Sequence, residues 1–562
     1  MPNVYPFNQP APTLGNQYLE DRVLRSYLKR VLPPLMLAEI EPTLQEMGTL
    51  AGGELFRLQQ EYRLHEPHHT PFDAWGNRID NVEVSPFWKY AERLAAEKGI
   101  VAASYNSPYG EFARVHQFAL AYLFHPSTDV FTCPLAMTDG AARTLLRSEN
   151  KTLIDRAVPH LTSRNADEFW TSGQWMTEST GGSDVGLTET IAEQDENGAW
   201  RLYGRKWFTS AVTAQMALTL ARPTGNSAGG DGLALFYVEL RNDAGQLQNI
   251  TVQRLKEKLG TKKLPTAELI LDGTPAHLVY DTHNGVRNIV PMLHITRTWN
   301  SICAISFMRR GIALARDYAG KRTAFGSTLN QKPLHADTLA TLQAEFEAAF
   351  HLVFFAVRLL GKDEAGTATD EERKLFRTLS SIVKLTSGKQ GVGIASEVLE
   401  CFGGAGYVED TGLPTLLRDS QVLSIWEGTT NVLSLDTLKS IASGGGLQLV
   451  YDHIQRLCAS LRDERLQECG RKSESAVQNV IRFLEEPRSP ESIALLEASA
   501  RRIAMTLGRA LSLALLAEHA EWSLHEESDT RARAAVCRFG ASPIDLMQNF
   551  DLDETFALAN DE

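Results

Sequence analysis

The chain has 562 residues, which is too long for one hydrophobic core, so we expect several domains. Hydrophobic residues make up 43% of the sequence and charged residues 22%, as in ordinary globular proteins, and there is no run of about 18 apolar residues to form a membrane span. The formal net charge of −13 counts against a dedicated nucleic-acid-binding protein, because such proteins carry an excess of positive charge.

Cysteine and histidine positions do not suggest a metal site. The six cysteines are scattered without a Cys-x-x-Cys pair, which favours free thiols in a reducing compartment. His65, His68 and His69 lie in a stretch that prolines interrupt, so we expect a polar loop there rather than metal ligands. The first residues lack the basic segment and apolar core of a signal peptide, so we expect a cytoplasmic protein.

Residues 1–22 are rich in proline and asparagine, so we expect an extended N-terminal arm. Two interpretations of this arm stay open. Either it is a disordered terminus, or it docks on a partner subunit through Tyr5, Phe7 and Tyr18.

The next two segments differ in the period of their hydrophobic residues. From 23 to 173 the apolar residues recur at helical spacing, for example in residues 87–94, which predicts an N-terminal helical domain. From 174 to 288, short runs of β-branched and aromatic residues such as 200–209 and 233–240 alternate with glycine-rich turns. We therefore expect a middle β domain inside an otherwise helical chain.

Helical spacing returns after the β domain. It continues from 289 to 442 and again from 447 to 562, and the glycines of Ser443–Gly446 predict a linker between these blocks. Residues 451–562 carry 13 Lys and Arg against 20 Asp and Glu, so the last block is acidic. The predicted fold class is mainly α, with a central β domain and an extra C-terminal helical domain.

Residues 424–431 set one carboxylate, Glu427, between Trp426 and a Gly-Thr-Thr turn. Gly428 lets the backbone approach a ligand, since it has no Cβ. Apolar neighbours can desolvate the acid and raise its pKa, which suits a general base. The alternative is an exposed glutamate at the end of a surface turn.

Two segments of the β domain carry hydroxyls beside glycines or aromatic residues. In Gln174–Gly186, a glycine pair exposes backbone N–H groups that suit an anion, although Gly-Gly-Ser-Asp is also a common turn. Its glycine spacing does not match a dinucleotide-binding loop of the Gly-x-Gly-x-x-Gly type. Trp207-Phe208-Thr209 offers aromatic rings and a hydroxyl that would flank a flat cofactor, or else forms part of the β core.

Two segments of the later helices are candidates for binding phosphate. Arg322–Gly326 follows a helix and offers a guanidinium group, unless Arg322 is simply solvated at the helix end. Phe402–Tyr407 is a glycine turn where backbone could approach a pyrophosphate, or it is a helix C-cap and loop.

Four of these segments are similar, in their order along the chain, to motifs of the acyl-CoA dehydrogenase family of flavoproteins. Residues 176–184 resemble the first family signature, and residues 400–410 resemble the second. Arg322–Gly326 and Ile425–Thr429 match two further family motifs.

A closer similarity is to the alkylation-response branch of this family, typified by AidB. The N-terminal arm, Cys133–Thr138, Arg254–Gly260 and the extra helical block after about residue 446 all resemble that branch. The resemblance implies an N-terminal helical domain, a middle β-barrel domain, a C-terminal helical bundle and one further helical domain.

The resemblance also implies FAD as the cofactor, bound between the β domain and the helical bundle of one subunit with help from another. The flavin ring would lie against the β domain, and the diphosphate and adenosine would reach helices across the subunit interface. The implied FAD contacts are Met176, Thr177, Gly182, Ser183, Trp207, Thr209, Arg322, Phe325, Glu400, Gly403, Gly404 and Thr429.

In the reaction that the resemblance implies, Glu427 is the catalytic base and Arg297 lies close to it. Glu427 removes the α-proton of an acyl-CoA substrate while the β-hydrogen leaves as hydride to flavin N5. The thioester carbonyl must be polarised, because the α-proton is only weakly acidic. The resemblance further implies an electron-transfer acceptor protein and a homo-oligomer, expected to be a homotetramer.

Two other functions stay open. AidB-type proteins are linked to DNA binding through the C-terminal block, so the chain is also a candidate DNA-associated protective flavoprotein with weak dehydrogenase activity. Arg501, Arg502, Arg531 and Arg533 are the basic residues that would contact phosphate, although the acidic balance of the block counts against such a surface. The other function is a lipid-binding regulator that uses the fold to sequester acyl chains.

Overall fold

In the computed structural model, which describes residues 10–486 and 490–561, the chain divides into two units. We call one the barrel unit, which comprises Glu54–Pro108 and His116–Trp299. We call the other the helical unit, which comprises Met1–Gly53, Tyr109–Val115 and Asn300–Glu562. The division groups residues that lie close in space, whereas the predicted domain boundaries follow composition, so those boundaries stay predictions.

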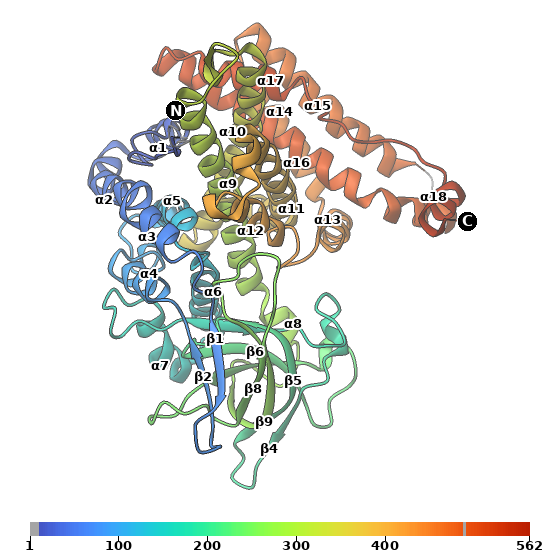
Figure 1. Ribbon diagram of the computed structural model, residues 1–562. Helices are drawn as coiled ribbons and strands as arrows, with labels where there is room; N and C mark the ends of the chain where they lie inside the picture. The colour runs from blue at the N-terminus through green and yellow to red at the C-terminus, as the bar shows by residue number, and fades with distance from the viewer. Residues whose placement is uncertain (1–9, 487–489, 562) are drawn as a thin grey trace, which may run out of the picture. The chain divides into compact units, whose positions relative to one another are not determined.

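A seven-stranded sheet forms the centre of the barrel unit (Figure 1). Its strand order is β3-β6-β4-β5-β9-β7, with β8 paired to β9, and it closes on itself because β7 also pairs with β6. This closed sheet confirms the predicted central β domain. The strands are β3 (Ser172–Trp175), β4 (Ile191–Gln194), β5 (Trp200–Ser210), β6 (Met216–Pro223), β7 (Ala234–Glu239), β8 (Ile250–Leu255) and β9 (Thr266–Leu278).

An ion pair lies inside this barrel. Lys206 of β5 is fully buried, and its Nζ lies 2.6 Å from Oε1 of the buried Glu178. Burial by itself raises the pKa of Glu178, but Lys206 and hydrogen bonds from Thr190 and the Glu189 amide outweigh it and hold that pKa below its usual value. The pair joins the segment after β3 to strand β5.

A hairpin and several helices complete the barrel unit. Its strands β1 (His68–Phe72) and β2 (Arg78–Glu83) occupy the stretch predicted as a polar loop. His69 Nε2 lies 2.9 Å from the Asp80 carboxylate, which Arg78 also binds. The helices are α3 (Glu54–Glu61), α4 (Pro86–Glu97), α5 (Ala113–Phe124), which begins in the helical unit, α6 (Thr132–Ser148), α7 (Lys151–Leu161) and α8 (Gly285–Asn288).

Long helices build the helical unit. In Figure 1, α10, α11 and α16 run side by side, and α15 lies along α16. Helix α9 (Val290–Lys321) begins in the barrel unit and continues into this one. The other helices are α1 (Arg22–Val31), α2 (Pro34–Gly52), α10 (Pro333–Ala365), α11 (Asp370–Cys401), α12 (Pro414–Val422), α13 (Thr430–Gly444), α14 (Gly446–Ala459), α15 (Glu464–Glu485), α16 (Pro490–Glu526), α17 (Arg531–Phe539) and α18 (Leu552–Asn560). Within the described residues, no helix is both long and apolar enough to cross a membrane.

The glycines of the predicted linker join two helices directly. Helix α13 ends at Gly444 and α14 begins at Gly446, so the single residue Gly445, with φ +66°, separates them. A Cβ built on Gly446 would lie 2.2 Å from the Thr378 hydroxyl. These glycines therefore allow a tight turn and close packing, rather than the flexible connection that their composition suggests.

The described part of the N-terminal arm docks on its own chain. The Thr13 amide donates to Asp317 of α9 at 2.7 Å, and the Tyr18 hydroxyl donates to Glu41 of α2 at 2.8 Å. Helix α1 then begins at Arg22 with Asp21 as its N-cap. The predicted contacts of Tyr5 and Phe7 lie outside the described residues.

Replacing Lys206 by methionine tests the buried ion pair. We expect Lys206→Met to lower the free energy of unfolding by about 3–5 kcal/mol at pH 7, because it leaves the Glu178 carboxylate buried without its partner. The depressed pKa of Glu178 stabilises the wild type above the unfolded pKa of about 4.3, and this contribution is lost as the pH falls through the folded pKa. The difference in free energy of unfolding between Lys206→Met and the wild type should therefore be smaller in acid.

Urea unfolding midpoints at pH 7 and pH 4 measure this difference, with the exposed Lys151→Met as the matched control. An equal loss of stability in both variants would contradict a specific role for the pair.

Candidate active site

Glu427 lies in the turn between α12 and α13 and is half-buried. Its φ is +57° and that of Gly428 is +105°, so two successive residues adopt left-handed backbone. This conformation costs a residue with a Cβ about 1–2 kcal/mol. A Cβ on Gly428 would lie 2.8 Å from the Leu433 side chain, so the second position requires glycine. A carboxylate held in such a strained turn is a candidate functional group.

Side chains from other helices hold the start of this turn. Asn300 of α9 donates from Nδ2 to the Leu423 carbonyl at 3.0 Å, and its Oδ1 accepts a hydrogen bond from Trp426 Nε1. At the other end, the Thr429 hydroxyl accepts from the Val432 amide at 3.4 Å and so forms the N-cap of α13. The predicted FAD contact Thr429 thus also starts a helix.

Strand β5 is irregular where the sequence predicts a cofactor face. Its pairing with β9 shifts by one residue between Lys206 and Thr209, as at a β-bulge. Both of these residues are fully buried, and the Thr209 hydroxyl donates to the Ala267 carbonyl at 2.7 Å. Trp207 and Phe208, which lie between them, are partly exposed.

The side of β5 away from the core therefore presents two aromatic rings followed by the half-buried Ser210. The Nζ atom of Lys256 lies 3.5 Å from the ring centroid of Trp207 and 4.6 Å from that of Phe208. Glu268 balances this charge at 2.6 Å. Sequence reasoning included Phe208 in the aromatic segment but missed Ser210 and Lys256, because a bulge leaves no mark in the pattern of residues.

The first signature segment lies beside these rings. The Thr177 carbonyl accepts a hydrogen bond of 3.0 Å from the Trp207 amide, and Met176 is buried next to it in the chain. The turn that follows exposes Gly182 and Ser183. The barrel unit thus brings six of the predicted contacts, Thr209 of β5 included, into connected segments.

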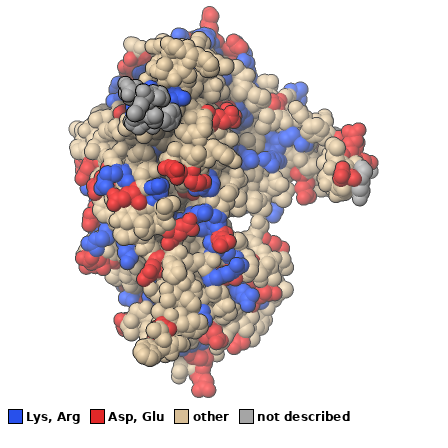
Figure 2. All heavy atoms as spheres, in the orientation of Figure 1, with Lys and Arg blue, Asp and Glu red and all other residues tan. Residues whose placement is uncertain are grey.

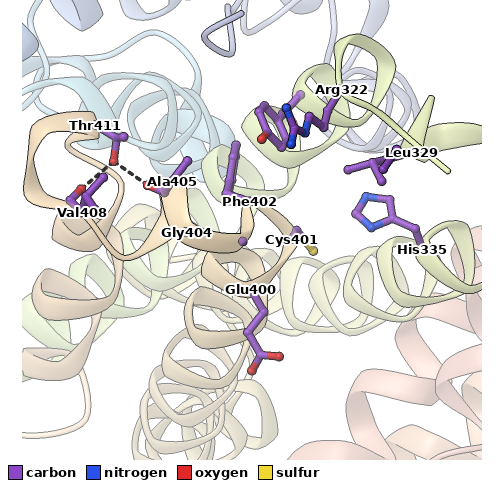
Figure 3. Close-up of a pocket in the computed structure, with 13 residues that line it drawn as sticks. Arg322, Leu329, His335, Glu400, Cys401, Phe402, Gly404, Ala405, Val408 and Thr411 are labelled. Carbon is purple, nitrogen blue, oxygen red and sulfur yellow. Dashed lines mark hydrogen bonds between the residues drawn. The ribbon is translucent and has the colours of Figure 1, made fainter. Parts of the chain in front are cut away.

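A second group of predicted contacts lines a cavity of about 690 Å³ in the helical unit (Figure 3). Arg322 follows α9, and Glu400, Gly403 and Gly404 lie at the end of α11. Beyond its own chain neighbours, a Cβ built on Gly403 or Gly404 would meet no heavy atom within 4 Å, so both glycines face open space. A guanidinium group opposite an open glycine turn suits a phosphate-bearing ligand.

The cavity also contains a residue that the motifs did not indicate. His335 of α10 points toward the cavity from the same side as Arg322 in Figure 3. Its Nε2 is buried without a hydrogen-bond partner among the described residues, and burial lowers the pKa of its ring, which favours the neutral form. Phe325, in contrast, does not line the cavity and is 98% exposed at the tip of the hairpin formed by β10 (Thr323–Ala324) and β11 (Ser327–Thr328).

The predicted site residues are divided between the two units. Arg297 lies half-buried on the part of α9 that belongs to the barrel unit, and Glu427 lies in the helical unit. Each is defined within its own unit, so their pairing stays a prediction. Within the described ranges, no three His, Cys, Asp or Glu side chains are grouped as metal ligands.

Comparison with protein families assigns nearly the whole chain. The AidB N-terminal domain matches residues 8–168, and the middle domain of acyl-CoA dehydrogenases matches residues 173–274. The C-terminal domain of acyl-CoA dehydrogenases matches residues 283–442, and a domain like the C-terminal domain of acyl-CoA dehydrogenase 11 matches residues 447–555.

Individual relatives agree with this assignment. Acyl-CoA dehydrogenase family member 11 of Caenorhabditis elegans is 42% identical over 547 residues, which cover 94% of this chain and 88% of that protein. The putative acyl-CoA dehydrogenase AidB of Escherichia coli is 31% identical and covers 79% of this chain and 81% of its own length. The crystal structure of C. elegans ACDH-11 in complex with C11-CoA superposes with a TM-score of 0.93 at 39% identity, over 99% of this chain and 96% of that one.

Substitutions at positions 209 and 210 test the bulge in β5. We expect Thr209→Val to lower the free energy of unfolding by about 1–2 kcal/mol, because it removes a buried donor from the Ala267 carbonyl. Ser210→Ala, on the half-buried outer side, removes a hydroxyl 3.1 Å from that of Thr266 and should cost less, about 0.5 kcal/mol. Chemical unfolding of both variants measures the difference, and the reverse ranking would contradict the side-chain directions in β5.

Proposed function

Because the chain belongs to the acyl-CoA dehydrogenase family, whose members are FAD-binding oxidoreductases acting on CH–CH groups, we propose that it dehydrogenates an acyl-CoA thioester between its α- and β-carbons. The observation that carries this proposal is the turn at Glu427. It holds a carboxylate in left-handed backbone inside the segment that resembles the family's catalytic motif. That carboxylate is the group that the reaction needs as a base.

The residues on the chain fit FAD. The cavity lined by Arg322, Gly403 and Gly404 offers a cation and open backbone to a diphosphate. The buried, unpartnered Nε2 of His335 offers a polar contact to the nucleotide in the same cavity. The rings on β5 offer a flat apolar surface to the isoalloxazine. When bound, FAD supplies the acceptor for the β-hydrogen and its electron pair.

The bulge in β5 changes one proposed flavin contact. The Thr209 hydroxyl is directed to the Ala267 carbonyl inside the barrel. Ser210 lies on the same side as Trp207 and Phe208, and its hydroxyl lies 3.1 Å from that of Thr266, so it keeps hydrogen-bonding capacity for a second partner. We therefore propose Ser210, in place of Thr209, as the hydroxyl that meets the edge of the flavin ring. Met176, Thr177, Gly182 and Ser183 keep the flavin and pyrophosphate contacts proposed for them.

The mechanism assigns one role to each group of residues. Glu427 takes the α-proton, and its backbone N–H donates to the thioester oxygen, which stabilises the negative charge that develops there. Arg297 supplies positive charge near the carboxylate. Trp426 and the apolar residues around the turn exclude water, so the carboxylate is not solvated when it removes the proton.

We propose that the cavity of the helical unit receives the nucleotide half of an FAD molecule bound to a second copy of the chain. Three large apolar residues on the segments around it are strongly exposed: Phe325 by 98%, Tyr407 by 88% and Leu334 by 82%. Exposed apolar side chains on neighbouring segments are typical of protein interfaces. This arrangement requires a homo-oligomer, and family resemblance favours a tetramer.

The substrate and the electron acceptor follow from the relatives. The C. elegans structure holds C11-CoA, so a saturated acyl-CoA of similar length is the first substrate to test on this chain. Family resemblance favours an electron-transfer protein as the acceptor.

The alternative of DNA binding receives little support from the C-terminal helices. Of the four candidate arginines, Arg531 is bound to Asp529 and Arg533 to Asp463, each at 2.8 Å. Arg502 lies over the Phe550 ring at 4.9 Å. Figure 2 shows basic side chains on the visible face of these helices, with acidic side chains at their far end. Such a mixed surface counts against extended phosphate contact.

Replacing the base tests the proposed function. We expect Glu427→Gln to retain bound FAD and its yellow colour, and to slow substrate-dependent bleaching by about 10³-fold, because general-base catalysis contributes about 10²–10⁴-fold. Anaerobic stopped-flow absorbance with C11-CoA measures the rate. Glu371→Gln, an exposed residue at the start of α11, is the control and should bleach like the wild type. Normal bleaching of Glu427→Gln would remove Glu427 from the mechanism.

A further inference from the structure

Lys384 lies on α11, and its side chain is fully buried. Its ammonium group donates a hydrogen bond of 2.7 Å to the carbonyl oxygen of Gly428, the residue directly after Glu427. Burial of an ammonium group is costly unless acceptors in the protein replace water. Breaking this bond is therefore unfavourable for the lysine as well as for the turn.

The same helix also contacts the start of the turn. Gly388 lies about one helical turn after Lys384, and a Cβ built on it would lie 2.8 Å from the Leu423 carbonyl oxygen. Asn300 donates to that same oxygen from α9. The segment is thus held at its start by Asn300 and the close approach of α11, and at its end by Lys384.

The bond from Lys384 bears on the direction of the Glu427 side chain. Glu427 has a φ of +57°, a left-handed conformation that an unrestrained residue with a Cβ avoids. Gly428 follows it with a φ of +105°. The Gly428 carbonyl is fixed by its bond to the ammonium, so rotation of the backbone at Gly428 is restricted. If that bond is lost, the turn can relax and carry the Glu427 carboxylate away from its position. Displacement of a reacting group by about 1 Å can cost about 10²-fold in rate.

We propose that Lys384 is a positioning residue for the catalytic base, holding the Glu427 carboxylate in place through the carbonyl of Gly428. This inference rests on the proposed role of Glu427. In this role Lys384 acts on the base through the backbone, because its buried ammonium group is bonded to the Gly428 carbonyl. A purely structural lysine would instead affect folding and FAD binding together with the rate.

The test compares Lys384→Met with Lys374→Met, an exposed lysine on the same helix. Methionine keeps much of the stem of lysine and removes the ammonium group. We expect Lys384→Met to bind FAD and C11-CoA within about threefold of the wild type, and to be bleached about 10²-fold more slowly. Lys374→Met should match the wild type in all three measurements.

A second measurement isolates the base from hydride transfer. In an acyl-CoA with sulfur in place of the β-carbon, the α-protons can be removed but no hydride can leave. We expect the exchange of its α-protons with D2O on the protein to slow by about the same 10²-fold in Lys384→Met. If Lys384→Met yields no folded protein, Lys384→Gln, which keeps an N–H donor on a neutral side chain, should fold and show an intermediate exchange rate.

The outcomes separate this inference from the proposed function. A wild type that is not bleached, or a Glu427→Gln variant that is bleached normally, contradicts the proposed function. If the wild type is bleached, and Lys384→Met or Lys384→Gln has the same bleaching and exchange rates as the wild type, the role of Lys384 is contradicted and the proposed function is not. Loss of FAD and of thioester binding in step with the rate also contradicts it, because the lysine would then serve the fold as a whole.

Discussion

The left-handed turn at Glu427 and Gly428 is the constraint on which the proposed chemistry depends. A residue with a Cβ stays in that conformation only where its neighbours hold it. Here the neighbours are Asn300 from α9 and Lys384 from α11. At Gly428 a Cβ would clash with a neighbouring side chain, so this position needs glycine. The long helices therefore do more than form a core, because they place one carboxylate in a defined backbone geometry.

In the barrel unit, an ion pair and a backbone hydrogen bond hold the proposed flavin face in place. The buried pair of Lys206 and Glu178 joins strand β5 to the segment after β3, and the Trp207 amide bonds to the Thr177 carbonyl beside it. The aromatic rings and the signature segment are thereby fixed to each other. A charged pair in the barrel costs desolvation energy, and its direct connection to both segments gives a physical reason for its position.

Much of the fold is predictable from the sequence, because the period of the hydrophobic residues changes from helical to alternating and back. The grouping of Arg322 with Gly403 and Gly404 agrees with the motifs.

Features that depend on contacts between distant residues could not be predicted from the pattern of residues. The bulge that turns Thr209 inward arises from pairing with β9, and Lys384, 43 residues before Glu427, reads in the sequence as an ordinary helical lysine. Pro71 interrupts the alternation of the hairpin at 68–83, and the glycines before α14 read as a linker although Gly446 packs against Thr378.

The central claim is that this chain binds FAD and passes the hydrogens of an acyl-CoA to it. The most direct measurement is the visible absorption spectrum of the purified full-length protein, recorded before and after anaerobic addition of C11-CoA. We expect a flavin spectrum from tightly bound FAD that bleaches when the thioester is added. A protein that is colourless and does not take up added FAD, or a flavin spectrum that no acyl-CoA changes, would contradict it.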